Sequence, residues 1–222
     1  MIDLRASTIK GQIKEISEEL ADSAEHLREL TKAVSIFGSA RTKPDNLYYT
    51  KTLEISRGLA QAGFSIISGG GPGIMEAANK GCHEAGGTSV GLCIKLPFET
   101  KDNVYLSHSV SFKYFMSRKT TFFMNSWAYI IMPGGFGTLD ELFEALTLIQ
   151  TRKANKAPII FVGHEFWADL LRFFETGLLA NGYISPEDLQ LYTVTDDPVE
   201  VVRIVQKAYE ENANQPHKLG LC

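Results

Sequence analysis

The chain has 222 residues, of which 44% are hydrophobic and 22% are charged, and this composition suits one α/β domain with a full core. Its formal net charge of −4 gives no long-range attraction to nucleic acid or to an anionic membrane. No apolar run approaches the roughly 20 residues of a membrane span, so we expect a cytoplasmic protein with no membrane or nucleic-acid partner.

The cysteines and histidines give no sign of a metal site. The three cysteines are far apart without a C-x-x-C pair, and the five histidines show no H-x-x-x-H pair. These spacings predict reduced thiols and no bound metal.

The first predicted element is a long amphipathic helix. From Ile9 to Leu30, apolar residues recur at spacings of three and four, which gives the helix one stripe to bury. The domain body and a partner subunit are both candidates to cover that stripe. We expect three segments: this helix at 1–32, a Rossmann-like nucleotide-binding catalytic domain at 33–212 and a loose tail at 213–222.

Short apolar runs then alternate with helical stretches. This alternation predicts a doubly wound parallel sheet with helices on both faces, the Rossmann-like α/β class. Strands are expected at 33–37, 64–67, 88–93, 127–132 and 158–162, with a short edge strand at 192–195. Helices are expected at 49–62 and 74–85, and a last helix is expected to start at 196–198.

The expected sheet order, 3-2-1-4-5, determines where a ligand binds. Such sheets bind ligands beyond the carboxyl ends of the strands, at the switch between strands 1 and 4. The loops at 38–41 and 133–138 should therefore meet there, and the loop at 68–73 should form the adjacent wall.

The segment 133–141, with the sequence PGGFGTLDE, is the most informative part of the chain. An apolar strand ends, glycines permit a tight turn near a ligand, and the N–H groups of a new helix attract an anion. These features predict a site for a phosphorylated small molecule. Thr138 and Glu141 also have the spacing of a capping box, in which they would only stabilise the helix start. The sequence leaves both interpretations open.

The second glycine-rich loop, SGGGPG at 68–73, does not fit the dinucleotide pattern G-x-G-x-x-G, and no G-x-x-x-x-G-K-[ST] occurs. NAD binding and ATP hydrolysis are therefore not expected. Glu76 lies in the first turn of the next helix, where the helix dipole alone favours a carboxylate.

A basic pair, Arg118 and Lys119, precedes the PGGFGTLDE segment. Alone, it is typical of the solvated face of a helix that buries Phe112, Phe115 and Phe122 on its other side. Together, MSRK at 116–119 and PGGFGTLDE resemble the arginine–lysine and PGGxGTxxE motifs of the Lonely Guy family of cytokinin-activating phosphoribohydrolases, often misfiled as lysine decarboxylases. The resemblance covers about residues 33–162, including GSAR at 38–41 and SGGGPGIME at 68–76.

The resemblance implies hydrolysis of the N-glycosidic bond of a nucleoside 5′-monophosphate, with AMP or an N6-modified adenine nucleotide as substrate. Positive charge then builds on the ribose, and Glu141 would stabilise it and orient a water molecule. Beside a helix N-terminus and a cation, Glu141 should stay ionised at neutral pH. Arg118 would hold the nucleotide or the departing base with its planar guanidinium. Lys119 would support the fold or bind the phosphate. The scheme needs no metal and no cofactor.

The resemblance also implies binding residues and a homodimer. Glu76 would bind ribose hydroxyls, and Phe112 and Phe115 would line the base pocket. The candidates for phosphate and ribose contacts are Ser39, Gly71, Glu76, Lys119, Gly134, Gly135, Phe136, Gly137 and Thr138. The helix from Met116 onward or the helix after Thr138 should contribute to the dimer interface, because these helices carry more apolar residues than one sheet face should hide, for example Ala145, Leu146 and Ile149.

Other functions remain possible on the sequence alone. One is a general purine or pyrimidine 5′-monophosphate nucleosidase. Another is a non-catalytic nucleotide sensor, although Arg118 and Glu141 argue against it. A lysine decarboxylase would need a pyridoxal-binding lysine and its partner acid, which we do not find in the sequence.

Overall fold

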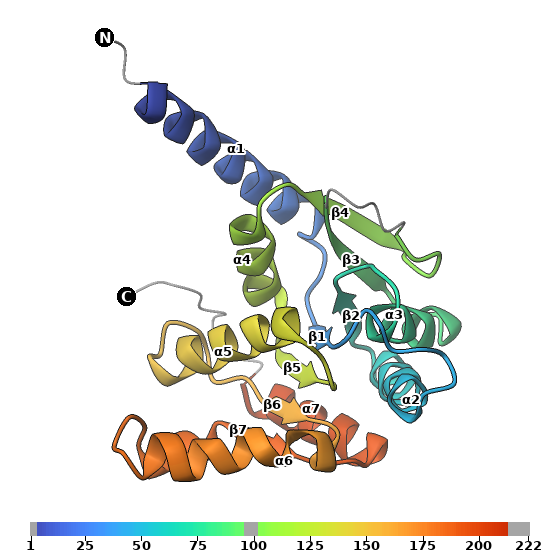
Figure 1. The fold of residues 1–222 in the computed structure, drawn as a ribbon. Coiled ribbons are helices and arrows are strands. Elements are labelled where there is room, and N and C mark those ends of the chain that lie inside the picture. Colours follow the sequence, from blue (N-terminus) through green and yellow to red (C-terminus); the bar gives the residue numbers. More distant parts are fainter. Residues whose placement is uncertain (1–3, 96–101, 213–222) are drawn as a thin grey trace.

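The fold is a parallel sheet covered by helices, seen in a computed structural model that describes residues 4–95 and 102–212 (Figure 1). The tail predicted at 213–222 lies outside the described residues. The strands are β1 (Ala33–Phe37), β2 (Ser65–Ser68), β3 (Ser89–Ile94), β4 (His108–Phe112), β5 (Ala128–Ile131), β6 (Ile159–Phe161) and β7 (Tyr192–Val194). The helices are α1 (Leu4–His26), α2 (Leu47–Gln61), α3 (Ile74–Glu84), α4 (Phe115–Asn125), α5 (Phe136–Gln150), α6 (His164–Phe173), the π-helix η1 (Phe174–Leu179), the 3-10 helix η2 (Pro186–Gln190) and α7 (Pro198–Asn212).

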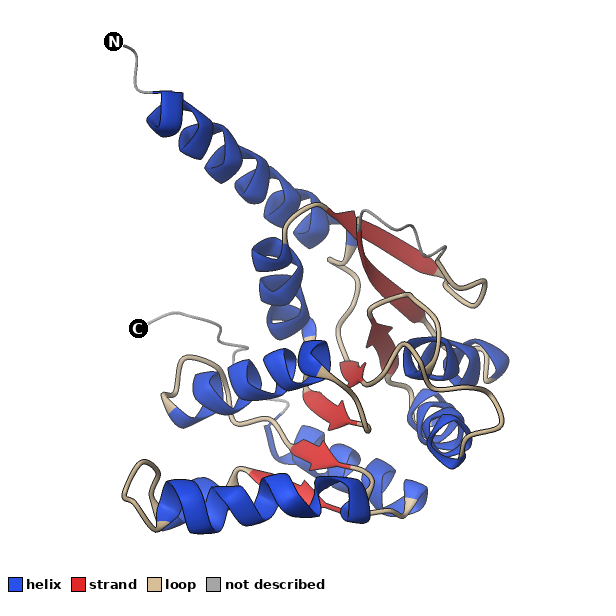
Figure 2. Cartoon of the chain, in the orientation of Figure 1, coloured by secondary structure: helices blue, strands red, loops and turns tan. Residues whose placement is uncertain are grey.

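The strands lie in the order β4-β3-β2-β1-β5-β6-β7, and all neighbouring strands are parallel (Figure 2). The predicted α/β class and the predicted order of the central strands are confirmed. The winding reverses between β1 and β5, which pair in register from Val34 with Ala128 to Phe37 with Ile131. The loops after these strands meet, because the Ser39 N–H donates to the Pro133 carbonyl at 3.1 Å.

Both faces of the sheet are apolar and covered. Val34 and Ile36 of β1 belong to a core shared with α2, α3 and α7, whereas Phe37 belongs to a core shared with α4, α5 and α6. Alternate residues of a strand point to opposite faces, so a central strand buried on both faces is mostly apolar along its length. The loops at the carboxyl ends of these strands therefore start from a rigid base.

The carboxyl-terminal half of α1 is anchored on α4 and on the residue after β4. Ser23 Oγ lies 3.0 Å from Thr121 Oγ1, and Glu19 accepts a hydrogen bond from the Lys113 N–H at 2.7 Å. The first turns of α1 project from the body (Figure 1), and there Ile9 and Ile13 are 54% and 60% exposed. The predicted apolar stripe is thus only partly buried in the single chain. No helix in the described ranges is both long and apolar enough to cross a membrane.

Strand β4 was missed by the sequence analysis, which placed Phe112 in a helix. Most of its side chains are exposed, so the run HSVSF lacks the apolar signal of a buried strand. Phe112 is buried at the end of β4, and α4 begins at Phe115, which is 53% exposed rather than buried. The prediction that one helix buries both side chains is therefore wrong.

Candidate active site

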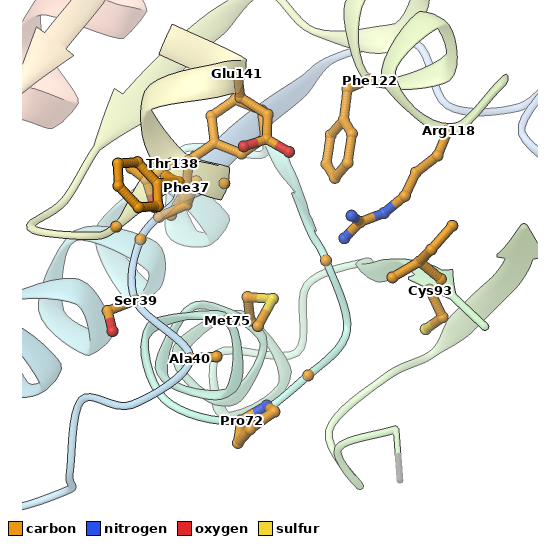
Figure 3. A pocket seen from close by; sticks show the side chains of 18 of the residues that line it. Phe37, Ser39, Ala40, Pro72, Met75, Cys93, Arg118, Phe122, Thr138 and Glu141 are labelled. Atoms are coloured by element: carbon orange, nitrogen blue, oxygen red, sulfur yellow. The ribbon is translucent and has the colours of Figure 1, made fainter. Parts of the chain in front are cut away.

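A cavity of about 760 Å³ opens at the carboxyl ends of the central strands (Figure 3). The loops after β1 and β2, the end of β3, one face of α4 and the start of α5 form its walls. The predicted site residues that line this cavity are Ser39, Gly71, Arg118, Gly135, Phe136, Gly137, Thr138 and Glu141. The chain topology therefore brings most of the predicted site together.

Helix α5 begins at the cavity without a capping side chain. The N-cap residue is Gly135, and Thr138 lies inside the first turn. A capping box requires its Ser or Thr at the N-cap position, so that interpretation of Thr138 and Glu141 is wrong. The first N–H groups of the helix, together with the helix dipole, form a suitable anion site. A side chain at Gly135 or Gly137 would meet nothing within 4 Å, which leaves this end of the cavity open for a ligand.

Glu141 lies in the second turn of α5 and is 8% exposed. Burial raises the pKa of its carboxyl group from 4.5 to about 7, although the nearby positive charge of Arg118 lowers it. Close to neutral pH, the carboxyl group of Glu141 is therefore partly ionised and partly protonated. This result corrects the expectation that Glu141 stays ionised at neutral pH, because the sequence shows the cation and the helix start but not how deeply the carboxyl group is buried.

Arg118 reaches the cavity from α4 and is also 8% exposed. Its Nε donates to the Leu92 carbonyl at 2.7 Å, and its Cζ lies 5.4 Å from the centre of the Phe122 ring. Burial lowers the pKa of the guanidinium group, and the charge of Glu141 opposes that shift. A hydrogen bond and an aromatic ring thus fix the guanidinium near the carboxyl group across the cavity (Figure 3).

Lys119, Glu76 and Gly134 do not line the cavity in the described part of the chain. The Lys119 Nζ lies 2.8 Å from Asp140 and 2.5 Å from Glu144, so it joins α4 to α5 behind the cavity. Glu76 accepts a hydrogen bond from the Tyr49 hydroxyl at 2.7 Å. These partners favour the structural interpretations that the sequence left open for Lys119 and Glu76.

Gly134 is required by packing, since a side chain there would collide with Thr138. Phe115 lines the cavity as expected, but the buried Phe112 does not.

The cavity also contains residues that the sequence analysis did not assign to the site. The most polar of these are Arg41, Cys93 and Asp102. Arg41 lies in the quoted GSAR segment and could have been chosen, because a cation beside a phosphate loop is chemically suitable. Cys93 and Asp102 had no such signal, because they lie near the unrecognised strand β4.

The fold and the cavity together define a class of protein. A parallel doubly wound sheet with helices on both faces is a Rossmann-like α/β protein, and here the uncapped start of α5 at the switch point is a candidate anion site. Within the described ranges, no group of three or more His, Cys, Asp or Glu side chains is arranged to hold a metal ion.

Comparisons with known proteins agree with this class. The family described as "Possible lysine decarboxylase" matches residues 75–205. The cytokinin riboside 5′-monophosphate phosphoribohydrolase of Mycobacterium tuberculosis is 32% identical over 157 residues, which cover 68% of this chain and 81% of the relative. A protein of the same name from Arabidopsis thaliana is 23% identical over 175 residues, covering 78% of this chain and 76% of the relative.

Two solved structures share the fold. The structural-genomics protein TM1055 is 26% identical with a TM-score of 0.61, covering 79% of this chain and 99% of that one. The molybdenum cofactor carrier protein of Chlamydomonas reinhardtii is 20% identical with a TM-score of 0.61, covering 81% and 99%, and supports the fold alone.

The chain belongs to the Lonely Guy family, in which the curated relatives named above are phosphoribohydrolases, hydrolases of N-glycosyl bonds. The resemblance found in the sequence, and with it the enzyme class, is confirmed at the level of the family.

Proposed function

We propose that this protein hydrolyses the N-glycosidic bond of a nucleoside 5′-monophosphate, releasing the free base and ribose 5-phosphate. One observation carries the proposal: Glu141 and Arg118 line the same cavity as the uncapped start of α5. If the phosphate binds at the start of α5 and the ribose extends toward Glu141, the nucleotide contacts the helix start, Glu141 and Arg118 together.

The carboxylate suits the chemistry of the bond. Cleavage between C1′ and the base nitrogen builds positive charge on the ribose ring, and a nearby ionised carboxylate stabilises that charge. In its ionised form, Glu141 is also able to orient the attacking water. Arg118, held by the Leu92 carbonyl, keeps the carboxyl group partly ionised and contacts the nucleotide.

The phosphate end is formed by backbone and cation together. The N–H groups at 135–138 and the Thr138 hydroxyl come from α5, and Ser39 and Arg41 come from the loop after β1. Charge-assisted hydrogen bonds of this kind are the strong ones in phosphate recognition. Gly71 forms part of the opposite wall.

The names of the relatives favour a cytokinin riboside 5′-monophosphate as the substrate, and we keep AMP and other N6-modified adenine nucleotides as candidates. The alternatives are a nucleosidase of wider base range and a non-catalytic nucleotide sensor. The test is to incubate the purified protein with AMP, isopentenyl-AMP and a panel of other nucleotides, and to detect free base and ribose 5-phosphate. We expect release of the free base from AMP or isopentenyl-AMP. If no nucleotide of the panel releases its base, the non-catalytic nucleotide sensor is favoured.

The phosphate site gives a first prediction, for the substitution Gly135→Val. The new side chain points into open space, so the fold should be retained while the anion is crowded. We expect the KM for AMP to rise by about tenfold or more with little change in the melting temperature. Gly135→Ala should give a smaller rise. Adenosine should be a poor substrate of the parent, and equal activity on adenosine and AMP would contradict the phosphate site.

A homodimer is a second prediction. Ala145 and Ile149 belong to the core, so they cannot provide the interface as the sequence suggested. Exposed side chains on the same helices support it instead, because Met116 is 69% exposed on α4 and Phe136 is 92% exposed on α5 beside the cavity. We expect the mass of a dimer by light scattering at micromolar concentration. A monomer at that concentration would contradict the proposal.

A further inference from the structure

The end of the cavity away from the phosphate loops holds an unassigned carboxylate. Figure 3 shows Ser39 and Thr138 on one side of the cavity and Arg118 and Cys93 on the other. Because Arg118 Nε binds the Leu92 carbonyl, the guanidinium lies against β3, next to Cys93. Asp102 also lines the cavity, with an exposed side chain.

Asp102 is tied to Cys93 through Ser109 of β4. Ser109 Oγ donates to Asp102 Oδ2 at 3.1 Å and lies 3.5 Å from Cys93 Sγ. The chain of contacts from the reaction centre therefore runs from Arg118 past Cys93 to Asp102. If the phosphate binds at the start of α5, as the proposed function requires, the base of the nucleotide extends toward Asp102.

A negative side chain in a cavity for an anionic ligand needs a reason. A carboxylate beside the phosphate would repel the nucleotide. The repulsion is weaker at the opposite end of the cavity, where the base lies. An ionised carboxylate accepts about four hydrogen bonds, and Ser109 supplies one. The remaining acceptor positions match the amino group of a base, and they repel a keto oxygen.

We propose that Asp102 selects the base by accepting a hydrogen bond from the exocyclic amino group of a 6-aminopurine. This inference rests on the proposed function and names its substrate class. Adenine with one substituent on N6 keeps one N–H for Asp102, whereas a doubly substituted amino group has none, and hypoxanthine presents an oxygen instead.

Cys93 helps to hold Asp102 in this position. Burial raises the pKa of its thiol to about 11, so the group is neutral and retains its S–H. Because the Ser109 hydroxyl donates its hydrogen to Asp102, the Cys93 S–H is the donor in the contact with Ser109 Oγ. The thiol therefore helps to orient Ser109 toward Asp102 and leaves the contact with the base to Asp102.

The experiment compares kcat/KM for AMP, N6-methyl-AMP, N6,N6-dimethyl-AMP and IMP. We expect the parent to cleave AMP and N6-methyl-AMP with similar efficiency, and dimethyl-AMP and IMP at least about tenfold less efficiently, because a site built around a hydrogen bond rejects analogues that lack it. In Asp102→Asn, the amide is able to donate to the keto oxygen, so the ratio of AMP to IMP should fall to about one. Asp102→Ala should also lose the preference.

Asp169→Asn is a matched control, because Asp169 is an exposed carboxylate on α6 that pairs with Arg172. It should keep every ratio of the parent. Circular dichroism and a melting curve should show that the Asp102 variants fold. Equal efficiency of the parent with AMP and IMP, or an unchanged ratio in Asp102→Asn, would overturn the inference while base release upheld the proposed function. No release from any of the four nucleotides, from isopentenyl-AMP or from the wider panel would contradict the proposed function and this inference with it.

Discussion

At pH 8, the Glu141→Gln variant should be more stable than the parent and yet lose almost all turnover. We expect kcat to fall by about two to four decades, because glutamine cannot supply the negative charge that stabilises the ribose cation. Nucleotide binding should be retained, since the anion site at the start of α5 is unchanged. The measurements are kcat and KM for the best nucleotide, together with the free energy of unfolding between pH 4 and pH 8.

The gain in stability follows from the sign of the pKa shift. The pKa of Glu141 is raised in the folded state from 4.5 to about 7 by burial, so the fold favours the protonated carboxyl group. That contribution is complete below about pH 4.5 and is lost as the pH rises through about 7. The parent should therefore lose up to about 3 kcal/mol relative to Glu141→Gln across this window. At pH 4 the two proteins should have similar stability.

Glu144→Gln is the control on the same helix. Glu144 faces Lys119 behind the cavity and not the cavity itself. This variant should show no gain in stability at pH 8 and should keep turnover within a few-fold of the parent. A Glu141→Gln enzyme that cleaves its nucleotide at a parental rate would show that Glu141 has no catalytic role. Equal stability of Glu141→Gln and the parent at pH 8 would contradict the raised pKa.

Much of the fold was predictable because its central strands are buried on both faces. Strand β1 was predicted with its observed bounds, and the switch between β1 and β5 placed the cavity correctly. Strand β4 was missed because an edge strand with exposed, polar side chains carries little apolar signal. This omission also hid the end of the cavity that contains Cys93 and Asp102.

Helical geometry explains why Arg118 lines the cavity and Lys119, which was also a candidate, does not. Consecutive residues of an α-helix point about 100° apart, so Arg118 and Lys119 point to different sides of α4. The same holds for Asp140 and Glu141. Arg118 and Glu141 line the cavity, while Lys119 and Asp140 bind each other behind it. The motif identified the pairs, but only the packing of α4 against α5 determines which member of each pair faces the ligand.

Substitution of Arg118 by methionine should change both the rate and its dependence on pH. In the parent, the charge of Arg118 lowers the pKa of Glu141 toward about 7, against the effect of burial. Without that charge, the pKa should rise further, and less of the enzyme is ionised at neutral pH. We expect kcat at pH 7 to fall by about two decades or more. In the parent, kcat should rise with pH around pH 7. In the variant, this rise should move to higher pH.

Arg118→Lys separates charge from geometry in this prediction. Lysine keeps the positive charge, so the midpoint of the pH profile should stay near that of the parent. It lacks the planar guanidinium that binds the Leu92 carbonyl and lies over Phe122, so KM should rise. Loss of the donor to Leu92 destabilises both variants by about 1–3 kcal/mol, which unfolding curves measure separately. An Arg118→Met enzyme whose midpoint equals that of the parent would show that Arg118 does not tune Glu141, and its role would then be limited to holding the nucleotide.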